Sequence, residues 1–215
     1  MIRRKLAALR DQILFFSRSI KEPKVPTNAD GRVLIHLGPG EENDDRFINV
    51  DTRPFPHIHI ISSVDVPGLF PDNYADLVYS CHILEHISHL KIPRLLSIWH
   101  QWLKEDGILR ISVPDIDKII AVYREHGSCE SIMNPLMGGQ GYEENFHKAI
   151  FNQPFLTQLL INAGFTNVEE WDPEKVEDYS FSDWADKKYV FEGKPYRISL
   201  NLQGIKGTRK NKAPN

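Results

Sequence analysis

Short apolar runs that end at turn residues recur through the chain. Residues 33–37 are apolar apart from one histidine, and the run stops at a Gly-Pro-Gly turn. This pattern is typical of a buried strand in a parallel sheet, where the carboxyl end of the strand opens onto a loop. The same reasoning predicts further strands at residues 47–51, 57–61, 76–80, 108–113, 165–171 and 198–204.

Helical spacing of apolar residues separates several of these strands. A helix is expected to begin within residues 83–89, and a second one covers residues 92–103. The stretch 104–107 ends in glycine and is expected to terminate this second helix in the C-cap region. Two more helices are predicted at residues 115–125 and 155–163.

Strands that alternate with helices predict an α/β fold, a mostly parallel sheet with helices on both faces. The last two strands have no helix between them, which predicts an antiparallel hairpin at one edge. Only about nine residues separate the first two strands, whereas a parallel crossover normally takes a dozen or more. Either the first crossover helix has shrunk to a loop, or the second strand is misplaced.

The turn after the first strand carries the first candidate chemistry. Gly38 and Gly40 let a ligand approach the backbone closely, because neither has a Cβ. The second strand ends in Asp51, and a carboxylate at that place can accept hydrogen bonds from both hydroxyls of a ribose. An ordinary strand-turn-strand explains the glycines equally well.

Two nucleoside cofactors compete for this turn. A dinucleotide fingerprint needs a third glycine, but that position holds Asn43, and two glutamates put negative charge where a pyrophosphate would lie. S-adenosylmethionine (SAM) carries no phosphate, and its sulfonium and amino groups are cationic. The acidic neighbours therefore favour SAM.

Composition bounds the class of protein. The chain has 215 residues, 41% hydrophobic and 26% charged, which is ordinary for a soluble globular domain. A net charge of −3 argues against a general nucleic-acid binder, so no nucleic acid is expected as a partner. Cys81 and Cys129 make no disulfide framework and indicate free thiols in a reducing compartment, which favours a cytoplasmic location.

The two ends of the chain differ from its middle. Residues 2–20 have apolar positions at helical spacing and an otherwise basic surface, which predicts an amphipathic helix. That helix either packs on its own domain or a second copy of the chain, or touches an anionic membrane surface such as the inner membrane. Residues 1–31 are therefore assigned to a helix and linker, and residues 206–215 to a basic disordered tail.

A series of motifs in a fixed order carries a resemblance to a known family: Leu34-Ile-His-Leu-Gly-Pro-Gly40, Ile48-Asn-Val-Asp51, Phe70-Pro-Asp-Asn73, Asp76-Leu-Val-Tyr-Ser-Cys-His-Ile-Leu-Glu-His86, Leu103-Lys-Glu-Asp-Gly-Ile-Leu-Arg-Ile-Ser-Val-Pro114 and Ala163-Gly-Phe165. The series resembles class I SAM-dependent methyltransferases, which have a Rossmann-like fold. It looks most like the small predicted methyltransferases found among bacterial surface-polysaccharide genes. The resemblance spans residues 32–205, taken here as one methyltransferase domain.

The resemblance implies roles for several positions. Gly38 and Gly40 would line the methionine moiety and the sugar of SAM, and Asp51 would hold the ribose hydroxyls. The loop that holds Ser63 and Asp65 would contact the adenine. Cys81 and His82 would lie beside the transferable methyl group.

A cluster of ionisable residues follows the fourth strand. His82, Glu85, His86 and His89 would share one face of a helix, and His147 follows the glycine-rich segment 137–142. One interpretation is structural, with Glu85 and His86 bonded to the backbone. A second makes His82 or His147 a general base for a sugar hydroxyl, since a neutral imidazole near pH 7 suits that task.

A third interpretation is a metal site built from His82, Glu85, His86 and His147. The pattern is similar to the E-x-x-E-H…H arrangement of metal-dependent O-methyltransferases, with His82 in place of the first glutamate. This replacement favours Mn²⁺, Fe²⁺ or Zn²⁺ over Mg²⁺.

The sequence leads to two hypotheses on function. The first is SAM-dependent O-methylation of a saccharide or of a glycolipid-linked glycan. The second is a SAM- or S-adenosylhomocysteine-binding module without turnover, which regulates or scaffolds partners through residues 2–20.

Overall fold

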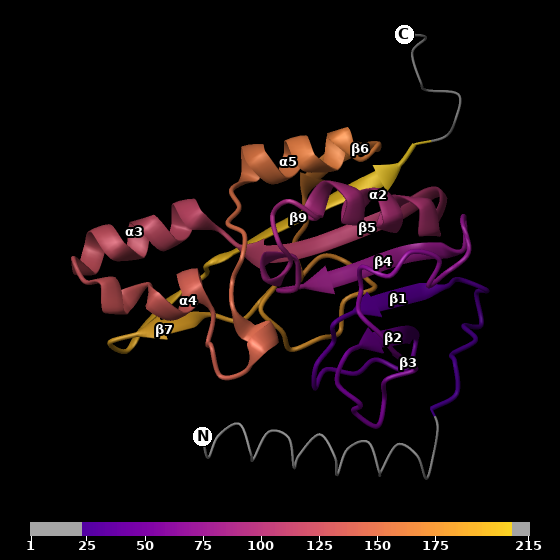
Figure 1. The fold of residues 1–215 in the computed structure, drawn as a ribbon, viewed down its shortest axis with the longest axis horizontal. Coiled ribbons are helices and arrows are strands. Elements are labelled where there is room, and N and C mark those ends of the chain that lie inside the picture. Colours follow the sequence, from indigo (N-terminus) through magenta and orange to yellow (C-terminus); the bar gives the residue numbers. More distant parts are fainter. Residues whose placement is uncertain (1–22, 208–215) are drawn as a thin grey trace, which may run out of the picture.

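The computed structural model describes residues 23–207 of the chain (Figure 1). Within them, seven strands form one sheet in the order β3-β2-β1-β4-β5-β9-β6. The first five strands in this order, from β3 across to β5, pair in parallel, and β9 runs antiparallel to both of its neighbours, β5 and β6. The strands are β1 (Leu34–Leu37), β2 (Phe47–Asp51), β3 (Ile60–Ile61), β4 (Ala75–Cys81), β5 (Leu103–Pro114), β6 (Phe165–Glu170) and β9 (Ser199–Lys206). The prediction of a mostly parallel, Rossmann-like sheet with an antiparallel pair at one edge is confirmed.

The connection between β1 and β2 is a loop, residues 38–46, with no helix. Strand β2 pairs with β1 in the register Leu34 to Phe47, so the second strand was placed correctly. The first crossover helix has therefore shrunk to a loop. The sheet face that such a helix normally covers needs another cover.

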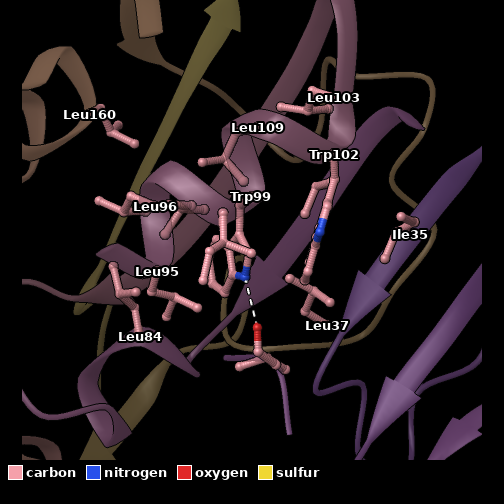
Figure 2. Packing of buried hydrophobic residues seen from close by; sticks show 14 of the residues in the cluster. Ile35, Leu37, Leu84, Leu95, Leu96, Trp99, Trp102, Leu103, Leu109 and Leu160 are labelled. Carbon is pink, nitrogen blue, oxygen red and sulfur yellow. Dashed lines mark hydrogen bonds between the residues drawn. The ribbon is translucent and has the colours of Figure 1, made fainter. Parts of the chain in front are cut away.

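One face of the sheet is covered by two helices, α2 (Ile92–Trp102) and α5 (Gln153–Asn162), which lie side by side in Figure 1. Pro93 suits the first turn of α2 because its missing N–H has no partner there in any helix. Trp99 and Trp102 pack in the core, where both are at most 1% exposed. Figure 2 shows them packed among leucines of α2, β5 and α5, with the Trp99 indole N–H donating to the Val64 carbonyl at 3.1 Å.

The opposite face is covered, within the described residues, by an irregular stretch that we call the covering segment, residues 171–187. Phe181 from this segment stacks on Tyr79 of β4, with ring centroids 5.1 Å apart. Its ring centroid also lies 4.4 Å from that of His36 of β1. Trp171 packs edge-on against Tyr79 and donates its indole N–H to the carbonyl of Ile111. This face is largely aromatic and partly polar, whereas the helical face is mostly aliphatic.

Beyond β5, helix α3 (Ile116–His126) begins at Asp115, whose side chain accepts from the backbone N–H of Asp117. The predicted helix is confirmed, and Asp115 is its N-cap. Helix α4 (Met133–Met137) and the hairpin of β7 (Tyr189–Phe191) and β8 (Lys194–Tyr196) were not predicted. They are too short to give a periodic pattern.

Three local predictions were wrong. The helix expected within residues 83–89 is a single 3-10 turn, η1 (Leu84–His86), because His82 turns the chain at φ 51° and Ile87 is already extended. The third strand is shorter than the predicted 57–61. Residues 104–107 do not cap α2, which ends at Trp102; they form an irregular start to β5.

The predictions for the chain ends lie largely outside the described residues, which include neither the amphipathic stretch 2–20 nor residues 208–215. Lys206 is described and belongs to β9, where its ammonium group donates to the Leu103 carbonyl at 2.7 Å. Both cysteines are free. No helix among the described residues is long and apolar enough to cross a membrane.

Candidate functional site

A cleft of about 1160 Å³ opens at the carboxyl ends of β1, β2 and β4, where open α/β sheets bind ligands. Its walls come from the loop after β1, the turn after β4, the segment after α4 and the covering segment. Every residue predicted to bind a cofactor or to act in catalysis lines this one cleft: Gly38, Gly40, Asp51, Ser63, Asp65, Cys81, His82, Glu85, His86 and His147.

Both glycines of the first loop have left-handed backbone conformations, with φ of 66° at Gly38 and 60° at Gly40. A Cβ on Gly38 would lie only 2.1 Å from the Cδ1 atom of Ile83, so this glycine also makes room for the turn after β4. The N–H of Gly38 donates to the carbonyl of Val50 at 2.7 Å, which ties the loop to β2. The loop is therefore a fixed, open stretch of backbone.

Asp51 lies at the tip of β2 and is 6% exposed. One of its oxygens accepts from the N–H of Gly40 at 3.0 Å and the other from the N–H of Arg53 at 2.8 Å. Each carboxylate oxygen has a second lone pair, so the group can still accept from two hydroxyls of a ligand. The two backbone bonds fix the direction in which the carboxylate points.

The loop after β3 forms the next part of the wall. The Ser63 hydroxyl donates to Asp65 at 2.5 Å, which is the main reason that the pKa of this carboxyl is lowered. The ammonium of Lys91 lies 3.5 Å from the same side chain. Because Trp99 holds the intervening Val64 carbonyl, the loop is anchored to the helical face of the sheet.

His82 has both ring nitrogens engaged. Its Nε2 lies 2.8 Å from the Ser199 hydroxyl, and that hydroxyl donates its proton to the Trp184 carbonyl at 2.6 Å. Nε2 must therefore be the protonated nitrogen, and Nδ1 faces a carboxyl oxygen of Glu85 at 3.3 Å. Burial lowers the pKa of His82 to about 3, so the ring is neutral at pH 7.

Glu85 is 1% exposed, and neither carboxyl oxygen makes a well-aligned hydrogen bond within the described residues. The contact of 3.3 Å to His82 is close but poorly oriented. Burial raises the pKa of Glu85 to about 8, so the protonated form predominates at neutral pH. Its backbone carbonyl accepts from the N–H groups of Lys148 and Ala149, which holds the segment after α4 against the turn.

Three ionisable side chains converge at this point. Each of Glu85, His86 and His147 offers a ligand atom within 4.8 Å of the other two, and the two imidazoles meet edge to face with centroids 4.9 Å apart. Burial lowers the pKa of both histidines, that of His86 to about 4. The nitrogens of His82 face Ser199 and Glu85 and lie outside this group, and His89 is exposed and does not line the cleft.

Several other residues that line the cleft were not predicted from the sequence. Arg53 places its guanidinium over the rings of Phe55 and Tyr142, at 4.8 and 5.6 Å. Asp183 and Lys187 reach the cleft from the covering segment. In that segment the apolar residues follow neither helical nor strand spacing. Its aromatic residues, set among charged ones, are the only sign in the sequence that it packs against the sheet.

Comparisons with known proteins bear on the family and the fold. Residues 3–170 match the model of a family described as a methyltransferase domain. A search of curated proteins by sequence found no significant match.

Solved structures with the same fold include several methyltransferases. A SAM-dependent methyltransferase from Archaeoglobus fulgidus is 18% identical, with a TM-score of 0.51 over 95% of this chain and 94% of the other. One from Thermotoga maritima is 15% identical, with a TM-score of 0.50 over 91% and 89%. The CurJ carbon methyltransferase is 13% identical, with a TM-score of 0.52 over 92% of this chain and 54% of the other. At these identities the likeness concerns the fold alone.

Proposed function

The chain belongs to the methyltransferase-domain family and has the fold of SAM-dependent methyltransferases, and from this premise we propose that it methylates a hydroxyl group of a saccharide or of a glycolipid-linked glycan. One observation carries the proposal. A single cleft joins a glycine loop and an oriented carboxylate, suited to a nucleoside, to a half-buried group of histidines suited to proton transfer. We further propose that the protein works in the cytoplasm.

In this proposal SAM lies along the carboxyl ends of β2, β1 and β4. Asp51 binds the ribose hydroxyls with the lone pairs that its two backbone bonds leave free. Ser63 and Asp65 border the adenine, and Gly38 and Gly40 border the methionine moiety. Cys81 and His82, at the tip of β4, then lie beside the methyl group.

Methyl transfer is an in-line displacement. The acceptor oxygen forms a bond to the methyl carbon as the carbon–sulfur bond breaks, and the hydroxyl proton passes to a base. His147 suits this role better than His82, because Nε2 of His82 carries the proton that it donates to Ser199 and Nδ1 faces the buried carboxyl group of Glu85. Burial keeps the pKa of His147 below its usual value, so its imidazole is neutral and able to accept a proton at pH 7.

The same cluster also fits a divalent cation. Two imidazoles and a buried carboxyl whose oxygens lack well-aligned partners are a set of donors that Mn²⁺, Fe²⁺ and Zn²⁺ accept. Glu85, His86 and His147 would hold the ion, which when bound would lower the pKa of the acceptor hydroxyl. His82 would then orient Glu85.

The saccharide acceptor is supported by an aromatic wall. Trp184 is 39% exposed, and its indole stacks on His82 with centroids 5.8 Å apart. Tyr142 is 38% exposed and lines the same cleft from the segment after α4. Exposed aromatic faces beside polar groups suit a sugar ring, which has apolar C–H faces and hydroxyl edges. The resemblance to enzymes of surface-polysaccharide gene clusters points to the same acceptor class.

Calorimetric titration with S-adenosylhomocysteine, followed by turnover of SAM on a panel of glycans, tests the proposal. We expect His147→Ala to lose at least a hundredfold in turnover, the range typical of general-base removal, with cofactor affinity unchanged. His89→Ala is the matched control, since this histidine is exposed and away from the cleft. Binding without turnover on any glycan would favour the alternative of a binding module, and absence of binding would exclude both.

A chelator separates the two roles of the cluster. If a cation is required, chelation abolishes turnover and one of Mn²⁺, Fe²⁺ or Zn²⁺ restores it. Turnover unaffected by chelation leaves His147 as a base without a metal.

A further inference from the structure

The covering segment is tied to the glycine loop by side chains far apart in the sequence. The N–H of Ser182 donates to the Glu42 carboxylate at 3.1 Å, and the Ser180 hydroxyl donates to Asp44. Farther back, Asp178 forms an ion pair with Arg32 at 2.6 Å. These contacts fix the segment beside the loop after β1.

One turn of this segment presents two opposite charges. The N–H groups of residues 186 and 187 both reach the carbonyl of Asp183, at 3.3 and 2.8 Å. This turn brings the side chains of Asp183 and Lys187 to the wall of the cleft that also contains Gly38 and Gly40.

Asp183 is a buried carboxylate with neutral partners. It is 7% exposed and accepts from the hydroxyls of Tyr79 at 2.6 Å and Tyr179 at 2.8 Å, and from the N–H of Ala185 at 2.9 Å. Among the ion pairs of residues 23–207, none contains Asp183. Burying a charge is costly unless a counter-charge compensates it, so this side chain favours a cationic ligand group.

Lys187 is differently placed. Its side chain is 48% exposed, and its ammonium is 3.6 Å from Glu42, a loose pair that a ligand carboxylate can join. In many nucleotide-binding sheets the N-terminus of the first crossover helix provides the positive end for an anionic group. The loop 38–46 contains no such helix, so that positive end must come from elsewhere.

We propose that this turn binds the amino-acid end of SAM, with Asp183 receiving the ammonium group and Lys187 the carboxylate. The proposal rests on the cofactor assignment above and adds a second wall to it, from residues about 140 positions beyond the glycine loop.

Calorimetry with four ligands tests each charge separately. S-adenosylhomocysteine carries both groups, its decarboxylated analogue only the amine, its deaminated analogue only the carboxylate, and 5′-methylthioadenosine neither. We expect Asp183→Asn to lower the affinity for the two amine-bearing ligands about tenfold or more, which is the loss typical of a charge-assisted hydrogen bond. The other two ligands should keep their affinity.

Lys187→Gln should weaken the two carboxylate-bearing ligands by a smaller factor, about threefold to fivefold, because this ammonium is half exposed. Asp186→Asn and Lys175→Gln are the matched controls. They change the same residue types on the same segment, where Asp186 pairs with Arg197 and Lys175 with Asp172, away from the cleft.

Equal loss of all four ligands in Asp183→Asn would assign this residue a purely structural role and overturn the proposal. Unchanged binding of S-adenosylhomocysteine in that variant would also overturn it. If the unmodified protein bound neither S-adenosylhomocysteine nor 5′-methylthioadenosine, the methyltransferase assignment itself would fail.

Discussion

The two faces of the sheet are built by different means. The helical face is a single, mostly aliphatic cluster around Trp99 and Trp102, to which amphipathic helices contribute. The other face has a smaller aromatic cluster under an irregular segment, with His36, Tyr79 and Asp183 buried within it. Apolar burial holds the first face, whereas directional polar contacts position the second. The covering segment on that second face brings Asp183 and Lys187 to the cleft.

The helical face should dominate the free energy of unfolding. Trp99→Ala removes a fully buried indole and its hydrogen bond to Val64, and we expect a loss of about 3–5 kcal/mol. Trp184→Ala, on the covering segment, should cost about 1 kcal/mol or less because that indole is 39% exposed. Urea unfolding measures both, and similar losses would contradict the comparison.

The helical face also reaches the glycine loop, through Ile83. Gly38→Ala puts a Cβ on a left-handed residue, about 2 Å from Ile83. We expect it to lower the free energy of unfolding by about 2–4 kcal/mol. Gly40→Ala meets only the flexible end of Arg53, at 3.1 Å, and should cost about 1–2 kcal/mol. Adding Ile83→Ala should relieve part of the Gly38→Ala loss in a double-mutant cycle. A strictly additive cycle would show that the clash relaxes by other means.

The polar face should be the acid-sensitive one. Burial lowers the pKa of His36 to about 3, with a smaller effect of His57 in the same direction and of Asp44 in the opposite one. The unfolded chain protonates this histidine below pH 6.5 whereas the native state does not, so stability falls as pH decreases from 6.5 towards 3. Between pH 7 and 4.5 this amounts to about 2–3 kcal/mol.

His36→Phe should remove that part of the pH dependence, since phenylalanine fits among Phe47, Tyr79 and Phe181. Urea unfolding at pH 7 and pH 4.5 measures the difference, with His89→Phe at the exposed site as the control. An unchanged pH dependence in His36→Phe would assign the acid sensitivity to other groups.

The smallest effect on stability should come from the ties of the covering segment. Asp178→Asn weakens the ion pairs with the half-exposed Arg32 and Arg46. We expect it to lower the free energy of unfolding by about 1 kcal/mol or less. The same change should lower the affinity for S-adenosylhomocysteine about twofold to fivefold, because the segment is then less firmly held beside the loop. Lys175→Gln on the segment serves as the control. Loss of stability without loss of affinity would separate the segment from the cofactor site.

The sequence predicted the parts of the site that lie on regular strands. Runs of buried residues identified β1 and β2, and the glycines and Asp51 at their tips follow from strand geometry. The group of Glu85, His86 and His147 was also anticipated, although the helix expected to align the first two is a single 3-10 turn. Long-range backbone bonds from Glu85 to residues 148 and 149 create the convergence, and spacing cannot reveal these.

The covering segment escaped prediction for a physical reason. Its position depends on contacts such as Ser182 to Glu42 and Tyr79 to Asp183, which join residues more than a hundred positions apart. Such contacts leave no periodic signal in the local sequence. In the same way, Asp106 takes a left-handed turn inside β5, so the glycine next to it was mistaken for a helix cap.

The shortened connection after β1 has a consequence for biosynthesis. Residues 38–51 hold the glycine loop and Asp51, but Asp183 and Lys187 of the same cleft wall emerge from the ribosome about 140 residues later. Strand β9, which pairs with both β5 and β6, emerges later still. A nascent chain therefore has the loop after β1 long before it has the covering segment, and the wall of the cleft that the two share forms only after residue 187 has been synthesised.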